Sequence, residues 1–298
     1  MHYFKNHQID KAKWDNAIQG IEGAPVYALS FYLDAVTGKK WGAYINNDYS
    51  ALIPVYYRNL PGIKRIIQPP FTQQLGLFTN RQDIHSGAIF KKLISRVPVV
   101  SYQTQKHPKL NGESNCRVNE RVTFTLNLNQ PFEEIKKQFS SNTKRNINKA
   151  RKFPQTLRTV SIDRFMQLIA RERTRLGIPQ KHLKRLKKLL EALEKRNSLL
   201  INGIDNNQNI IAAGAWIITP NRIYYLAGAS TEEGFHKRSM FLLQNHVIEL
   251  FSNTNAVYDF EGSMIPGIAR FFASFGAQPE VYYYTEKNTL PTFGNTNR

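Results

Sequence analysis

The sequence predicts an α+β protein of two domains, each built as a mixed, twisted sheet flanked by helices. The chain has 298 residues, and domains average roughly 100–200 residues, so the length favours two domains. Segments with an apolar period of two alternate with segments at helical spacing along the whole chain. The predicted elements follow a similar order in both halves, although no repeat is visible residue by residue.

The first predicted domain covers residues 1–130. Its predicted elements are helices at 10–21 and 31–36, strands at 41–45, 51–57 and 63–68, a helix at 83–95, and strands at 97–103 and 121–128. The first two strands should form a hairpin across the turn-forming residues 46–48. Pro54 favours an edge or a bulge for the second of them, because proline cannot donate a hydrogen bond to a neighbouring strand. The polar segment 106–119, which includes Cys116, is predicted as an exposed loop.

A basic helix at 131–152 is predicted to connect the two domains, with a break or kink around 140–143. Its cations gather towards its C-terminal end: Lys144, Arg145, Lys149, Arg151 and Lys152. Two interpretations are open at this point. The helix is either a solvated linker, as most charged runs are, or a positively charged lip for RNA or for a donor that carries phosphate.

The second predicted domain covers residues 153–298. Its predicted elements are a strand at 157–160, a helix at 161–176, a helix that begins at Pro179, strands at 199–204, 210–218 and 222–229, a loop at 228–234, a helix at 239–251, and the segment 256–284. The helix that begins at Pro179 carries an outer row of cations: Lys184, Arg185, Lys187 and Lys188. The helix at 239–251 is apolar nearly all round, which predicts that it is buried between layers.

The segment 256–284 is the most informative part of the chain. It begins with a predicted strand, and if that strand runs to Glu261, its period of two places Asp259 and Glu261 on one face. Gly262 and Ser263 then end the strand. The helix that follows is predicted to bury one apolar stripe, formed by Ile265, Ile268, Phe271, Phe272 and Phe275. Two carboxylates beside a glycine turn form either the floor of a reaction site or a plain strand–turn–helix corner.

The net charge of +19 is the strongest compositional signal. It implies attraction to nucleic acid, anionic lipid or phosphorylated small molecules, and it does not choose among them. Cys116 is the only cysteine, so no internal disulfide can form, which fits a reducing cytoplasm. No run approaches the roughly 20 apolar residues that span a bilayer. No secretory signal is visible, and the seven histidines are scattered, so we expect neither a membrane span nor a metal site.

Three stretches and the element order of the second half, β-α-α-β-β-β-α-β-α-β, carry a family resemblance. The stretches are NTKRNINKARK (Asn142–Lys152), YYLAGAS (Tyr224–Ser230) and DFEGSMIPGIARFFASFG (Asp259–Gly276). The element order resembles the GCN5-related N-acyltransferase (GNAT) fold, and the doubled arrangement resembles the Fem-type aminoacyltransferases and their FemAB/BioF2-like relatives. The first stretch is similar to that family's basic NxRxxIRKA-type helix, and the second to its central strand with a small-residue exit. The third is similar to its D-x-x-G…G-x-x-x-F-K-x-x-F-G ending.

The resemblance implies two tandem GNAT-like domains and an N-acyltransferase that moves an acyl group from acyl-CoA, as a co-substrate, to an amine. One departure bears on the donor. Fem-type transferases carry a lysine in the F-K-x-x-F-G segment that meets negative charge at the reacting carbonyl, and this sequence has Phe272 there. Arg270 lies two residues earlier, about 200° round the helix, so it does not simply replace that lysine. Acyl-CoA is therefore preferred as donor. Two alternatives remain. The donor is aminoacyl-tRNA, which explains the charge better, or the protein is a catalytically silent module that binds RNA or another anion.

The resemblance also implies where the donor binds. Its pantetheine arm would lie against the central strand, at Gly228, Ala229 and Ser230. Its phosphates would lie at the start of the next helix, where N–H groups and the helix dipole favour anions. The residues there are Lys237, Arg238 and Ser239. The family's glycine-rich phosphate loop is missing, so a purely solvated role for the two cations is equally open.

The candidate catalytic residues are Asp259, Glu261 and Arg270. Either carboxylate would act as the general base or orient the acceptor, since burial raises the pKa of a carboxyl group. The alternative is a structural ion pair with Arg270. Tyr283 and Tyr284 would reprotonate a leaving thiolate, or they are core and edge-strand aromatics, which is the commoner role.

Overall fold

The computed structural model describes residues 1–60, 62–84, 86–110, 115–206, 209–262 and 264–290. They divide into two compact units. The first unit contains Met1–Arg121 and the C-terminal residues from Val281, and the second contains Val122–Glu280. The predicted second domain ended at residue 298. The residues from Val281 belong to the first unit because they pair with one of its strands.

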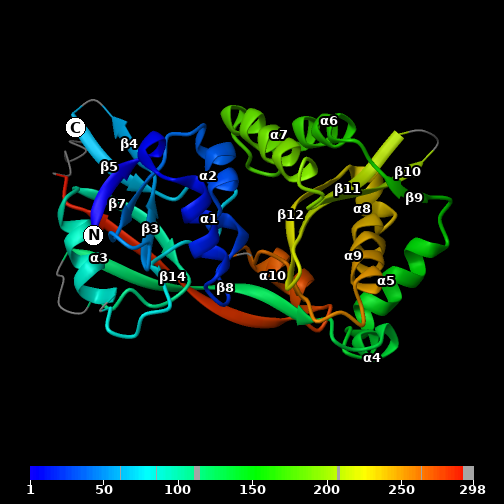
Figure 1. Ribbon diagram of the computed structural model, residues 1–298. Coiled ribbons are helices and arrows are strands. Elements are labelled where there is room, and N and C mark those ends of the chain that lie inside the picture. Colours follow the sequence, from blue (N-terminus) through cyan, green and yellow to red (C-terminus); the bar gives the residue numbers. More distant parts are fainter. Residues whose placement is uncertain (61, 85, 111–114, 207–208, 263, 291–298) are drawn as a thin grey trace, which may run out of the picture. The chain divides into compact units, whose positions relative to one another are not determined.

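In its described part, the first unit contains three α-helices and all or part of nine strands. Figure 1 labels most of these elements. The helices are α1 (Lys11–Gln19), α2 (Ser30–Thr37) and α3 (Ser86–Ser95). The strands are β1 (His2–Lys5), β2 (Gly42–Ile45), β3 (Ala51–Val55), β4 (Tyr57–Leu60), β5 (Ile63–Ile67), β6 (Phe78–Thr79), β7 (Val99–Thr104), and parts of β8 (Cys116–Asn127) and β14 (Gln278–Asn288). Cys116, predicted in a loop, begins β8. Strand β1 was not predicted, because its mostly exposed side chains show no apolar alternation.

The strands of the first unit lie in two groups. Strands β1-β2-β3-β6 form an antiparallel sheet in that order. Strands β4-β5-β7-β14 are neighbours in that order, and β5 and β7 run parallel. The predicted hairpin is confirmed as β2–β3, with Ala43 opposite Pro54. Strand β6 pairs with β3 only at Ala51 and Leu52, so Pro54 has a strand on one side alone, as proline requires.

Among its described residues, the second unit has seven α-helices, six neighbouring strands and the first residues of β14. The helices are α4 (Phe132–Lys137), α5 (Ser141–Arg151), α6 (Ile162–Glu172), α7 (Gln180–Glu194), α8 (Glu232–His236), α9 (Ser239–Leu250) and α10 (Pro266–Ala273). Besides β8, the strands are β9 (Thr156–Thr159), β10 (Leu199–Asn206), β11 (Asn209–Ile218), β12 (Arg222–Ser230) and β13 (Val257–Asp259). The segment 228–234, predicted as a loop, instead contains the end of β12 and the start of α8, because Thr231 caps α8 through Gly234 N.

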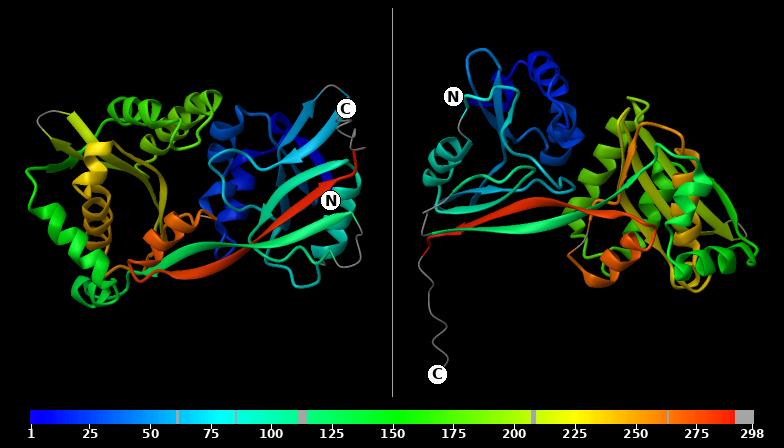
Figure 2. Two further views of the ribbon diagram at one scale, coloured as in Figure 1. Left: turned by 180° about the vertical axis from the view of Figure 1, so that it is seen from behind. Right: turned by 90° about the horizontal axis from the view of Figure 1, so that it is seen from below.

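The sheet of the second unit has the order β8-β13-β12-β11-β10-β9. It is mixed, because β12 and β13 are parallel while every other neighbouring pair is antiparallel. Helices α6 and α7 lie on one face, and α9 lies on the other face beside α5 (Figures 1 and 2). The predicted mixed sheet with helices is thus observed in this unit.

The basic connecting helix is broken where the sequence predicted. Helix α4 ends at Lys137 and α5 begins at Ser141, because Ser140 Oγ accepts a hydrogen bond from Thr143 N at 3.1 Å and caps the second helix. Helix α5 is amphipathic. It buries Ile147 and Ala150 against α9, so it is a packed element of the second unit and no solvated linker.

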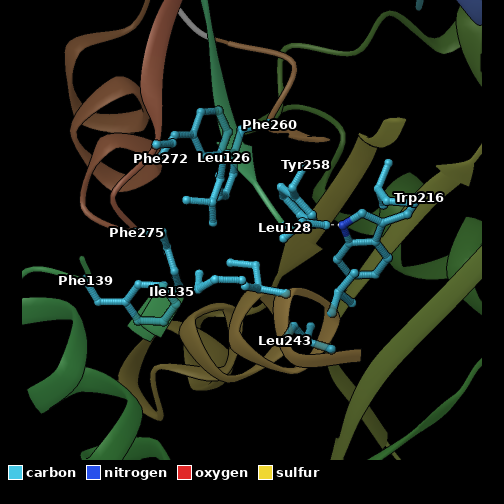
Figure 3. Packing of buried hydrophobic residues seen from close by; sticks show 14 of the residues in the cluster. Leu126, Leu128, Ile135, Phe139, Trp216, Leu243, Tyr258, Phe260, Phe272 and Phe275 are labelled. Carbon is cyan, nitrogen blue, oxygen red and sulfur yellow. Dashed lines mark hydrogen bonds between the residues drawn. The ribbon is translucent and has the colours of Figure 1, made fainter. Parts of the chain in front are cut away.

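Aromatic side chains from the closing segment form much of the core of the second unit (Figure 3). The Phe260 ring centroid lies 5.0 Å from that of Phe272 and 5.8 Å from that of Phe275. The predicted apolar stripe is only half buried, however. Phe272 and Phe275 belong to the core, whereas Ile265 is 60% and Ile268 is 40% exposed. These two exposed side chains lie at the start of α10.

Candidate functional site

The two parallel strands of the second unit separate at their C-terminal ends. Strand β12 pairs with β13 from Arg222 to Tyr224, and beyond Tyr224 it continues to Ser230 with β11 as its one described strand neighbour. Strand β13 ends at Asp259 because the chain then turns through Glu261 (φ 53°) and Gly262 (φ 23°). A side chain at Gly262 would overlap the backbone of Val122, so only glycine fits there.

A cavity of about 450 Å³ occupies the gap that this separation opens. Its walls come from β12, the segment between α6 and α7, helices α8 and α9, and helix α10. Its lining is mostly apolar and aromatic: Leu176, Tyr225, Phe235, Met240, Phe241, Ile268, Phe271 and Phe272. Predicted donor-site residues Gly228, Ala229 and Ser230 also line it. Its size and apolar character are those of a small-molecule site.

The cavity side of β12 is an open strand edge. Among the described residues, β13 offers no partner to Tyr225–Ser230. A β-bulge adds to the irregularity, because Trp216 pairs with Tyr225 and Ala215 pairs with Ala227, which leaves Leu226 without a partner on β11. Open backbone groups can accept an extended ligand that carries amide groups, as an added strand does.

Two arginines line the cavity, and one of them, Arg175, forms an ion pair with Glu172 at 2.8 Å. Arg175 donates a hydrogen bond to the carbonyl of Ser230 and stacks 4.5 Å from the Phe235 ring centroid. Arg238 precedes α9 in the left-handed conformation (φ 62°), which is rare for a side chain of its size. Its guanidinium has no ion pair or side-chain hydrogen bond among the described residues. No aspartate or glutamate is among the described residues that line this cavity.

A second, basic cavity of about 490 Å³ adjoins the first, since Arg238 and Phe241 line both. Its other lining residues come from one face of α5, at spacings of three and four residues: Asn142, Arg145, Asn146 and Lys149. Arg145 is held in place by a hydrogen bond from Nη2 to Asn142 Oδ1 at 3.0 Å. Of the two interpretations of the basic helix, this geometry favours the charged lip.

Asp259 is a buried, fully engaged carboxylate. Its Oδ1 accepts hydrogen bonds from Thr123 Oγ1 at 2.6 Å and from Glu261 N at 2.8 Å, and its Oδ2 lies 3.3 Å from Arg222 Nη1. Arg222 also binds Glu280, at 2.6 Å. Burial raises the pKa of Asp259 above its ordinary value, and the charge of Arg222 opposes this rise. The ion-pair alternative is therefore realised with Arg222 in place of Arg270.

The shared face predicted for Asp259 and Glu261 is not formed, because β13 ends before Glu261. Glu261 is half-buried at the point where the strands separate. It shares with Arg238 a left-handed backbone, and strained residues of this kind concentrate at functional sites. Arg270 is exposed on α10 and does not line either cavity.

The three residues predicted to bind the phosphates have different surroundings in the structure. Arg238 lines both cavities. Lys237 instead forms an ion pair with Glu233 at 2.9 Å and is largely buried. Ser239 is fully buried, and its Oγ donates a hydrogen bond to Gln155 Oε1 at 2.8 Å. The anchoring of Ser239 fixes the start of α9.

The tyrosine at the cavity is Tyr225, which the sequence analysis did not single out. Burial raises its pKa, so its hydroxyl stays protonated at physiological pH. The hydroxyl lies over Gly228, where a side chain would overlap it. Tyr283 and Tyr284 lie instead in the first unit, where Tyr283 packs on His107 and Tyr284 stacks with Arg121. The core-and-edge interpretation fits these two residues.

Comparison with solved structures places the chain in a known fold. FemX superposes with a TM-score of 0.69 at 11% identity, over 96% of this chain and 97% of that chain. L-PGS from Bacillus licheniformis gives a TM-score of 0.58 at 12% identity, over 95% and 93% of the two chains. An acetyltransferase of the GNAT family from Colwellia psychrerythraea gives 0.50 at 12% identity, over 97% and 100%. The protein therefore has a FemX-like GNAT fold, as predicted.

The sequence itself matches no family model and no curated protein. Within the described part of the chain, no helix is long and apolar enough to cross a membrane. The same residues contain no group of three or more histidine, cysteine, aspartate or glutamate side chains that could hold a metal ion.

Proposed function

We propose that the second unit binds acyl-CoA and transfers its acyl group to an amine. The observation that carries this proposal is the continuity of the two cavities. The apolar cavity, with its open β12 edge, suits an acyl group and the amide-bearing pantetheine arm. The adjoining basic cavity, lined by Arg145, Lys149 and Arg238, suits the phosphates. The GNAT fold supports an acyltransferase of this kind.

The reaction is a direct transfer. The amine nitrogen attacks the thioester carbonyl carbon, the carbon–sulfur bond breaks, and an amide forms. We assign Glu261 as the base that takes the proton of the attacking nitrogen, since it is the half-buried carboxylate at the strand separation. Tyr225, whose hydroxyl is protonated in the cavity wall, donates a hydrogen bond to the leaving thiolate, which takes its proton from solvent. Asp259 is a positioning residue, because it holds Glu261 N and the start of β12.

The charges of the cavity favour a neutral acyl group over an aminoacyl group. An aminoacyl donor carries an ammonium group, which needs carboxylate or carbonyl acceptors close by. The wall offers Arg175 and Arg238 and no acidic side chain among its described lining residues. Arg238 would repel the ammonium, whereas Glu172 balances the charge of Arg175 at 2.8 Å. The apolar rings of Phe235 and Phe271 would instead bury an aliphatic chain.

Aminoacyl-tRNA is the second candidate donor. The likeness to FemX and the net charge of +19 favour it. On this alternative the basic face of α5 would bind the tRNA backbone, and affinity would fall steeply with salt.

We also propose that the first unit is a second, divergent copy of the GNAT fold, since the order β1-α1-α2-β2-β3 repeats the opening order β9-α6-α7-β10-β11.

The test is release of free thiol from octanoyl-CoA in the presence of a panel of small amines. We expect thiol release that depends on the amine, and Glu261→Gln should lower kcat at least tenfold without changing Tm. Glu249→Gln, which removes an exposed carboxylate from α9, is the matched control and should be fully active. Transfer from aminoacyl-tRNA with no thiol release from any acyl-CoA would reject the proposed donor.

A further inference from the structure

The first unit contains a cavity of its own, of about 280 Å³. Two side chains that face each other across neighbouring strands, Tyr44 on β2 and Ile53 on β3, belong to its lining. Helix α3 supplies Ala88, Ile89, Lys92 and Leu93, and Arg96 follows directly after its last residue. Met1 completes the lining. The cavity thus lies between a helix and the small antiparallel sheet.

The lining is divided into an apolar part and a cationic part. Ile53, Ile89 and Leu93 are aliphatic, whereas Lys92, in the last turn of α3, and Arg96, just after the end of α3, are cationic. None of the described lining residues is acidic. A cavity of this composition suits a ligand with one negative group and a short apolar tail.

Arg96 is held at the cavity by a buried tyrosine. Its Nη1 donates a hydrogen bond to Tyr44 Oη at 3.2 Å, and its guanidinium carbon lies 5.4 Å from the Tyr44 ring centroid. Tyr44 Oη lies 3.1 Å from Tyr57 Oη, and Lys64 Nζ lies 4.1 Å from the Tyr57 ring centroid. A guanidinium has five N–H donors, so others remain for a ligand.

Tyr57 does not neutralise these cations. Burial, together with the hydrogen bond shared with Tyr44, raises the pKa of Tyr57, so its hydroxyl stays neutral at physiological pH. The cationic end therefore keeps its positive charge. A planar guanidinium fixed in this way binds a carboxylate through two parallel hydrogen bonds.

We propose that this cavity binds a small amphipathic carboxylate. Its carboxylate group lies between Lys92 and Arg96, and its aliphatic tail packs on Ile53, Ile89 and Leu93. The site is independent of the acyl transfer proposed for the second unit, because every residue that forms it belongs to the first unit.

Calorimetric titration of the full chain with octanoate, and with octylamine as the probe of opposite charge, tests the proposal. Octanoate should bind and octylamine should not. Arg96→Met removes the charge, and Ala88→Phe fills the cavity. Each variant should weaken octanoate binding at least tenfold. Lys91→Met removes a charge from the same helix outside the cavity lining and should leave binding unchanged.

Octanoate could also enter the cavity of the second unit, so the titration is repeated with Gly267→Phe, which is expected to fill that cavity. Binding should persist in this variant. Loss of binding in Gly267→Phe, equal binding of octylamine, or unchanged binding in Ala88→Phe would each overturn the proposal, and so would no binding to the parent protein. Thermal melts show which variants are folded, and Ala88→Phe decides the case if Arg96→Met does not fold.

Discussion

Filling the cavity of the second unit from Gly267 is the sharpest perturbation that the structure offers. Gly267 lines the cavity near the start of α10, and a Cβ added there meets no atom within 4 Å. A larger side chain can therefore point into the cavity without displacing backbone. Replacing a helical glycine also removes a cost of roughly 0.5–1 kcal/mol, so Gly267→Ala and Gly267→Phe should keep or raise Tm.

The expected effect on the donor follows from the space that the introduced ring takes. If the new phenyl ring of Gly267→Phe excludes about four methylenes of an octanoyl group from the cavity, binding loses ~3 kcal/mol at ~0.8 kcal/mol per methylene. This corresponds to roughly a hundredfold rise in Kd. Calorimetric titration with octanoyl-CoA should show this rise for Gly267→Phe and a near-native Kd for Gly267→Ala. Equal affinity in both variants would refute the placement of the acyl group.

Three further predictions concern the charged residues of the second unit. Lys149→Gln and Arg238→Gln should each weaken CoA binding by roughly tenfold, whereas Lys184→Gln on the outer row of α7 should not, as titrations with CoA will show. Arg222→Met should lower the free energy of unfolding, measured in denaturant, by about 3–5 kcal/mol, because it leaves a buried carboxylate unpaired. Adding Asp259→Asn to this variant should restore most of the loss. Losses that simply add in the double variant would contradict the ion pair. The pKa of Asp259 is raised in the folded state, so folding favours the protonated carboxyl group. This contribution to the free energy of unfolding is fully present below the unfolded pKa of about 3.9 and is lost as the pH rises through the folded pKa. Melts of parent protein and Asp259→Asn should therefore diverge in favour of the variant from pH 4 to pH 7, and parallel curves would contradict the raised pKa.

Local patterns in the sequence were sufficient for the α+β class and for most elements. The break between α4 and α5 follows from Ser140, because serine is a preferred residue at the position just before a helix. The packing of Phe272 and Phe275 follows from helical spacing. Helical spacing does not show which end of a helix is covered by the rest of the protein. For this reason the sequence did not predict that Ile265 and Ile268 are exposed.

The parts that the sequence did not predict depend on contacts between distant residues. An ion pair was only the alternative interpretation of Asp259, and its expected partner was Arg270. The observed partner, Arg222, lies 37 positions away and reaches Asp259 only because β12 and β13 are parallel neighbours. Tyr225 is a cavity residue only because the two strands separate just after Tyr224. The location of the C-terminal strand in the first unit likewise depends on its pairing with β7, which no local pattern encodes.

Hydrogen exchange of the backbone amides tests the central claim most directly, because it locates the donor on the chain. The open edge of β12, from Tyr225 to Ser230, should exchange more slowly when octanoyl-CoA is bound, since an amide-bearing ligand completes that edge. The start of α9 and the face of α5 that contains Lys149 should also be protected. Binding of octanoyl-CoA without protection of 225–230 would contradict the claim, and so would protection of these segments by aminoacyl-tRNA alone.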